Sequence, residues 1–92
     1  MKTLHLETGD WAADFTQCHH LAGRLADGLL DTPMRLSFYD RERNLESPNG
    51  VSECHQGCTT PGWVDYAMNR GGSLMIDFDH GRFVFCFMGT PL

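Results

Sequence analysis

The stretch that most constrains the fold is Ser73–Met88, SLMIDFDHGRFVFCFM, which has the pattern of a β-hairpin. Two runs of alternating residues flank His80-Gly81, and a glycine in a two-residue loop is typical of a tight turn that needs positive φ. The turn fixes the register, so one face of the hairpin is wholly apolar. On that face we expect the cross-strand pairs Phe78–Phe83, Ile76–Phe85 and Leu74–Phe87.

The other face of the hairpin, called the reverse face below, is only half polar. A sheet face with this many apolar side chains is poorly suited to contact with water. We therefore expect either the long loop described below or a partner molecule to cover it. The cross-strand pairs expected on this face are Asp79–Arg82, Asp77–Val84, Met75–Cys86 and Ser73–Met88.

Two strands and a long helix precede the hairpin. Thr3–Glu7 and Met34–Tyr39 alternate apolar and polar residues, which predicts two strands, each with one buried face. Between them, Asp10 is a suitable N-cap for a helix from Trp11 to about Asp27. A strand, a helix and a strand form a βαβ unit, so we expect the two strands to be parallel. The apolar stripe of this helix consists of Trp11, Phe15, Cys18, Ala22, Leu25 and Leu29.

A short helix follows the loop and completes the fold. Thr60 can cap it, Pro61 suits its first position, Gly71 ends it, and Trp63 and Ala67 face inward. We expect both helices to pack on the apolar face of the hairpin. The predicted fold class is α+β, a two-layer sandwich in the order β-α-β-loop-α-β-β, with a mixed four-stranded sheet, one long helix and one short helix. Residues 1–92 are expected to form one small domain.

The irregular segment at residues 40–60 is unusual. Loops longer than roughly 12–15 residues without their own structure are uncommon in compact domains. We expect this segment to be disordered, to contain a small hairpin, or to be held by a bound group. The hairpin would pair Arg41–Leu45 with Val51–Cys54 across Asn49-Gly50.

This segment also carries the strongest local set of metal ligands, because thiolate and imidazole are the ligands that zinc prefers. The spacing of its cysteines is wider than in zinc knuckles, and no second pair follows. A fourth ligand would come from the long helix, where His19, His20 and Cys18 are the candidates, although Cys18 is better explained as a small core residue. Two surface thiols in a loop are the simpler interpretation, so we expect no cofactor, with zinc as the alternative. The predicted metal ligands are Cys54, His55 and Cys58.

Catalysis is the weaker hypothesis. A cysteine nucleophile needs a base within reach, and His55 next to Cys54 would point away on an extended chain. Asp77 and Asp79 share a sheet face, and paired carboxylates can perform acid–base chemistry or bind a hard cation. A cross-strand ion pair explains them more simply. The chain has no nucleophile elbow, Walker motif or dinucleotide fingerprint. The enzyme alternative is a small pocket that uses Asp77 and a histidine.

Composition excludes some classes of partner. The net charge of −5 argues against a nucleic-acid binder and against an anionic membrane surface. The sequence has neither the pattern of a signal peptide nor an apolar run long enough to span a membrane, so we expect a cytoplasmic protein with free thiols. The function that follows is a small binding or regulatory module, non-catalytic and self-associating, with a homodimer or another protein as partner. Its predicted binding surface consists of Met75, Asp77, Val84, Cys86, Met88 and Trp63.

Overall fold

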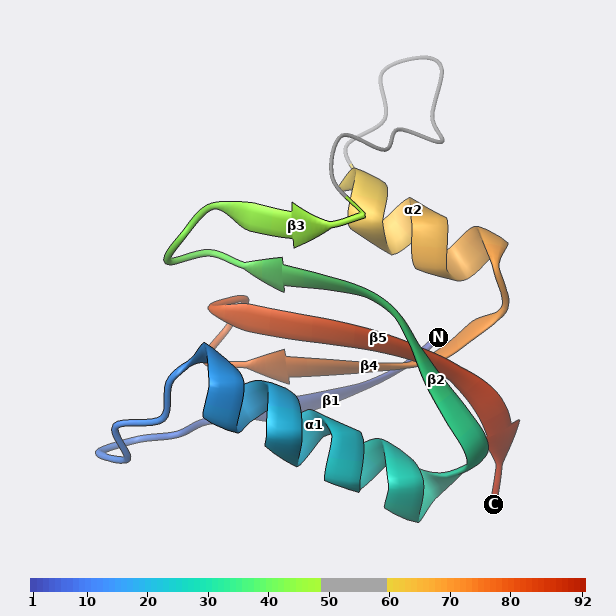
Figure 1. Ribbon diagram of the computed structural model, residues 1–92, viewed down its shortest axis with the longest axis horizontal. Coiled ribbons are helices and arrows are strands. Elements are labelled where there is room, and N and C mark those ends of the chain that lie inside the picture. Colours follow the sequence, from blue (N-terminus) through green and yellow to red (C-terminus); the bar gives the residue numbers. More distant parts are fainter. Residues whose placement is uncertain (49–59) are drawn as a thin grey trace.

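A computed structural model describes residues 1–48 and 60–92 of the chain. In these residues the fold is α+β, with two helices packed on a mixed five-stranded sheet of strand order β1-β4-β5-β2-β3 (Figure 1). The predicted fold class is confirmed, with one strand more than expected. The elements are β1 (Lys2–Leu6), α1 (Phe15–Leu29), β2 (Leu30–Asp40), β3 (Leu45–Ser47), α2 (Gly62–Asn69), β4 (Gly72–Phe78) and β5 (Phe83–Pro91).

The first two strands run in the same direction, as the βαβ pattern predicts, but they are not neighbours. β1 pairs with β4 in parallel, and β4, β5 and β2 then follow one another in antiparallel pairs. The β4–β5 hairpin is therefore inserted between β1 and β2. It occupies the centre of the sheet, which explains why its strands are the most apolar in the chain.

The predicted register of the hairpin is confirmed for every pair between Leu74–Phe87 and Phe78–Phe83. At the open end the prediction was wrong, because a register shift after Gly72 places this residue, not Ser73, opposite Met88. At the closed end the loop has positive φ at three successive residues, Asp79, His80 and Gly81.

Residues outside the hairpin hold this strained loop. The amide of Asp79 donates to the carbonyl of Leu6 at 2.8 Å. Its carboxylate accepts from the amide and the hydroxyl of Thr8, each at 2.8 Å. Asp79 and Arg82 meet through their side chains, at 3.3 Å, and not as a pair of the strand ladder.

The fifth strand, β3, lies inside the segment that was expected to be irregular. It pairs antiparallel with the end of β2, and residues 41–44 form the turn between the two strands. The partner strand predicted for Arg41–Leu45, Val51–Cys54, lies outside the described residues. A tight turn follows β2 because the buried carboxylate of Asp40 accepts from the amide of Arg43 at 3.2 Å and from its Nε at 2.5 Å. Residues 49–59 lie outside the described part of the chain.

Helix α1 begins at Phe15, four residues later than predicted, because its N-cap is Asp14 and not Asp10. The amide of Gln17 donates to Asp14 Oδ1 at 2.9 Å, and the amide of Asp14 donates to Gln17 Oε1 at 3.0 Å. This reciprocal capping box satisfies two backbone donors at once. Trp11 consequently lies outside the helix and is 68% exposed, and Leu29 at the other end is 42% exposed. The predicted stripe holds between them, with Cys18 and Ala22 buried.

The two helices pack on opposite faces of the sheet, not on one face as expected (Figure 1). α1 covers the phenylalanine face of the hairpin, and α2 covers part of the reverse face through Trp63 and Ala67. A hydrogen bond of 2.9 Å from the hydroxyl of buried Ser37 to the carbonyl of Trp63 fixes α2 to β2. The N-cap of α2 is Pro61, which makes no side-chain cap, so the predicted role of Thr60 was wrong.

Candidate functional site

The reverse face is divided between covered and open positions. Among the predicted binding residues, Val84 and Cys86 are buried under α2, and Trp63 is buried as part of that helix. Met75, Asp77 and Met88 remain half-buried. The cover that the sequence assigned to the loop or to a partner is thus supplied in part by the short helix.

Beside α2 the reverse face is hollowed into a groove of about 450 Å³, which we call the reverse-face groove. Four residues of the predicted surface line it: Trp63, Met75, Asp77 and Val84. Cys86 and Met88 do not. The remaining lining comes from β1, β2, the β4–β5 loop and the start of α2, so sequence reasoning on the hairpin alone missed it. These further residues are His5, Tyr39, Pro61, Val64, His80 and Gly81.

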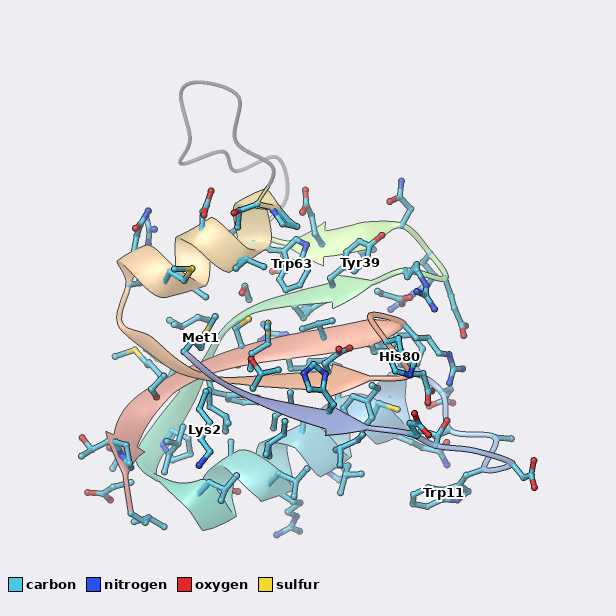
Figure 2. The ribbon with its side chains drawn as sticks, turned by 180° about the vertical axis from the view of Figure 1, so that it is seen from behind. Met1, Lys2, Trp11, Tyr39, Trp63 and His80 are labelled. Carbon is cyan, nitrogen blue, oxygen red and sulfur yellow. The ribbon has the colours of Figure 1, made fainter. Side chains whose placement is uncertain are left out.

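One wall of the groove is aromatic. The rings of Tyr39 on β2 and Trp63 on α2 are stacked, with their planes 3° apart and their centroids at 5.5 Å (Figure 2). Trp63 is buried and Tyr39 half-buried, so the tyrosine ring provides more of the accessible surface. The pattern of alternation placed Tyr39 on a strand face, but only the packing of α2 brings the two rings together.

The polar part of the groove is a histidine–carboxylate pair. The parallel register of β1 and β4 sets His5 opposite Asp77, and His5 Nδ1 lies 3.0 Å from Asp77 Oδ2. The other carboxylate oxygen accepts from the amide of Gly81 at 2.6 Å. The Asp77 side chain is 14% exposed and that of His5 69%. Asp77 is therefore a fixed group on the floor, and His5 an exposed one at the rim.

Asp77 and Asp79 do not form a pair of carboxylates, because each has its own donors. The hydrogen bonds from Thr8 hold the pKa of Asp79 below its usual value, with a smaller contribution from Arg82. His80 lies 3.1 Å from Glu7, with both side chains exposed. The acid–base hypothesis from the sequence is thus reduced to Asp77 and His5.

The predicted metal ligands Cys54, His55 and Cys58 lie outside the described residues. Within residues 1–48 and 60–92, no group of three histidine, cysteine or acidic side chains is placed to hold a metal ion. Cys18 is buried in the core, and burial raises its pKa. Burial also raises the pKa of Cys86 to about 11. Neither thiol has the lowered pKa of a reactive nucleophile.

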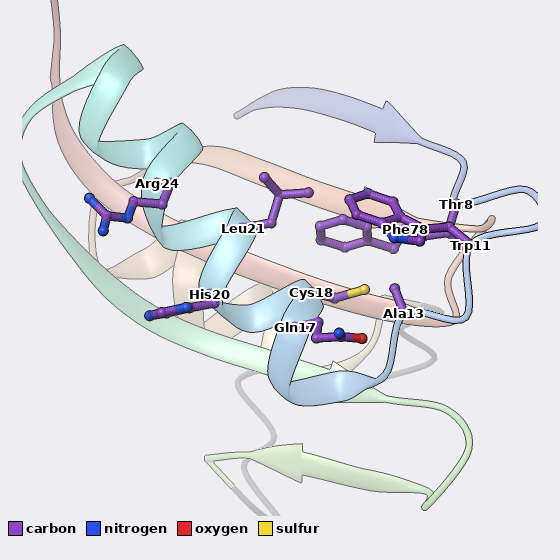
Figure 3. Close-up of a pocket in the computed structure, with 9 residues that line it drawn as sticks. All are labelled: Thr8, Trp11, Ala13, Gln17, Cys18, His20, Leu21, Arg24 and Phe78. Atoms are coloured by element: carbon purple, nitrogen blue, oxygen red, sulfur yellow. The ribbon is translucent and has the colours of Figure 1, made fainter.

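A second, smaller hollow of about 280 Å³ lies near the start of α1, on the other side of the sheet (Figure 3). Trp11 and Phe78 stand at one end of it, and the sulfur of Cys18 points toward them. His20 and Arg24 also contribute, but their side chains point away from Trp11. We call this the Trp11 hollow. Sequence reasoning missed the Trp11 hollow because it placed Trp11 on the apolar stripe of the helix.

The part of the chain that the structure describes contains no helix that is long and apolar enough to cross a membrane. Comparison with known proteins gives one family and one fold relative. Residues 1–87 match the model of a family described as Domain of unknown function (DUF5619). The crystal structure of protein AF1514 from Archeoglobus fulgidus is similar to this one, with a TM-score of 0.76 and 24% identity over 97% of this chain and 94% of that chain. At this identity the likeness shows the fold alone. No curated protein matches the chain.

Proposed function

This chain belongs to the DUF5619 family of domains of unknown function, and we propose that it is a small binding module that takes a ligand into the reverse-face groove. The observation that carries the proposal is the groove itself. It gathers an aromatic wall and a fixed carboxylate over an apolar floor, in a volume within the range of small-molecule sites. Pockets of this kind bind through apolar area and take their specificity from a few polar groups.

The chemistry of the lining supports binding over nucleophilic catalysis. The described residues of the groove include no serine, threonine, cysteine or lysine side chain. The two buried cysteines stand in the core clusters and not at the groove. A histidine–carboxylate pair can orient a ligand, and the described lining places no serine, threonine or cysteine beside it for the histidine to activate.

Self-association is a further part of the proposal. The reverse face supports it less than the sequence suggested, because α2 already buries Val84 and Cys86. What supports it is a set of exposed apolar side chains elsewhere, including Met34 and Met68, each 57% exposed. Light scattering at micromolar concentration tests this part separately. A monomeric mass would contradict self-association and would leave the proposal for the groove unchanged.

A fragment screen by NMR tests the proposed site. We expect fragments that bind to shift the backbone amide of Gly81 and the indole N–H of Trp63, which lie at the groove. Hits that shift only the indole N–H of Trp11 and its neighbours would place the site in the Trp11 hollow and contradict the proposal. The two tryptophans lie at different hollows, so each reports on its own.

A further inference from the structure

We propose that the reverse-face groove selects a small organic ammonium ion whose nitrogen carries apolar substituents. This inference rests on the proposed function of the groove and deepens it by naming the chemical class of the ligand. It is carried by the juxtaposition of the Asp77 carboxylate with the stacked rings of Tyr39 and Trp63.

The charges around the groove favour a cation. Asp77 is the single acidic residue among the described lining residues, which include no lysine and no arginine. The two histidines of the lining each face a carboxylate: His5 faces Asp77 at 3.0 Å and His80 faces Glu7 at 3.1 Å. Arg41 lies beside the β4–β5 loop, where its Nη1 donates to the carbonyl of His80 at 3.1 Å, but it is not one of the lining residues. Among the described lining residues the carboxylate of Asp77 is therefore the permanent charge, and it favours a cationic ligand over an anionic one.

The groups that the Asp77–His5 pair leaves for a ligand are acceptors. An ionised carboxylate only accepts, so the nitrogen of His5 that faces Asp77 Oδ2 is the one that donates. In the neutral ring the second nitrogen of His5 is then an acceptor. Each oxygen of Asp77 has one protein partner and can accept a further hydrogen bond. The remaining acceptor capacity and the negative charge of Asp77 both suit a cationic ligand.

The aromatic wall and the apolar floor suit the rest of an ammonium ligand. A cation over the face of a tyrosine or tryptophan ring is attracted by the ring quadrupole, and such faces recognise alkylated ammonium groups. Tyr39 is held in its orientation by its stack on Trp63. Met75, Val84 and Val64 offer aliphatic and thioether surface to the substituents.

Three probes of similar shape and different charge test the inference. Choline carries a quaternary ammonium, 3,3-dimethylbutan-1-ol replaces its nitrogen by carbon, and 3,3-dimethylbutanoate carries a negative charge. Titration of each probe is followed by the shifts of the Gly81 amide and the Trp63 indole. We expect choline to bind at least about tenfold more tightly than the neutral alcohol, and the anion to bind most weakly.

Two variants locate the effect. Asp77→Asn keeps an oxygen that can accept from the Gly81 amide, so the fold is retained, while the negative charge is lost. We expect it to reduce choline affinity about tenfold and to leave the neutral alcohol unchanged. Tyr39→Leu removes the aromatic face, and we expect it to reduce the affinity for choline more than the affinity for the alcohol. The control is Asp27→Asn, which removes the same charge from an exposed position on α1 and should leave the affinity for all three probes unchanged.

The possible results separate this inference from the proposed function. If choline and the neutral alcohol bind equally, or the anion binds best, the ammonium inference is wrong and the groove stays a binding site. The same holds if Asp77→Asn and Asp27→Asn behave alike. If none of the three probes shifts the resonances of the groove, both proposals are contradicted.

Discussion

At the scale of single residues, hydrogen-bonded acidic side chains decide where the chain departs from simple patterns. Asp40 and Asp79 each accept two or more hydrogen bonds from neighbouring turns, and each fixes a loop that alternation alone left undefined. His19 is the opposite case, a titratable ring packed among aromatic side chains. Its ring stacks on Phe85 with the planes 4° apart and the centroids at 5.0 Å.

His19 makes the stability of the fold sensitive to acid. Burial lowers its pKa below the usual value, and the nearby charges of Arg35 and His20 lower it further. Between the pKa of His19 in the folded chain and its higher pKa in the unfolded chain, the unfolded chain binds more protons than the folded chain. The contribution of His19 to the unfolding free energy is therefore complete above the ordinary histidine pKa and is lost as the pH falls below it. We expect the melting temperature of the wild type to fall further between pH 7.5 and pH 5 than that of His19→Phe.

The control for this prediction is His20→Gln, at the exposed neighbouring position. It should keep most of the acid sensitivity of the wild type, because the burial of His19, the largest cause of its lowered pKa, is unchanged. Parallel dependence of the melting temperature on pH in the wild type and in His19→Phe would show that His19 does not carry the effect.

Asp79 allows a second prediction at this scale. Asp79→Ala leaves the amide and hydroxyl of Thr8 without their acceptor, which we expect to cost about 1–3 kcal/mol of unfolding free energy. Asp79→Asn keeps an acceptor oxygen and should cost less. Urea unfolding measures both variants, and equal losses in the two would mean that the hydrogen bonds to Thr8 contribute little.

At the scale of elements, alternation and helical periodicity predicted both helices and every strand of the described residues except β3, and the phenylalanine pairs of the hairpin were correct in register. Element ends were less predictable: the sequence favoured Asp10 as the N-cap of α1, and the structure has Asp14 in that position. The choice between them depends on Gln17, which completes a capping box only with Asp14. The second face of the sheet was recognised as incompletely polar, but α2 could not be assigned to it, since periodicity shows that a helix has an apolar stripe and not which surface receives it.

The capping box gives a prediction for α1 with a matched control. Asp14→Ala removes the acceptor for the amide of Gln17 and should cost about 1 kcal/mol of unfolding free energy. Asp10→Ala, at the position that the sequence favoured, should be close to neutral. Urea unfolding of the two variants decides between the two starts of the helix, and the reverse order of losses would restore the start at Trp11.

At the scale of the whole molecule, the candidate site is assembled from parts that are distant in the sequence. His5 reaches Asp77 only because β1 pairs with β4, and Tyr39 reaches Trp63 only because α2 packs against β2. The hairpin supplied the floor of the site, and its residues were predicted. The walls depend on the strand order and on the face of the sheet on which α2 packs. Neither of these can be predicted from the composition or the spacing of residues in one stretch of the chain.

The central claim is that the reverse-face groove is where this module binds its ligand, and a pair of methionine variants tests it most directly. Met75→Lys places a charged chain on the half-buried floor of the groove, whereas Met68→Lys places the same chain on α2 at a position that is 57% exposed and outside the groove. A lysine stem can direct its ammonium to water, so both variants should fold, which their thermal melts check. The measurement is the affinity of the tightest fragment from the NMR screen. Loss of at least about tenfold in Met75→Lys with wild-type affinity in Met68→Lys is the predicted result, and unchanged affinity in folded Met75→Lys would contradict the account.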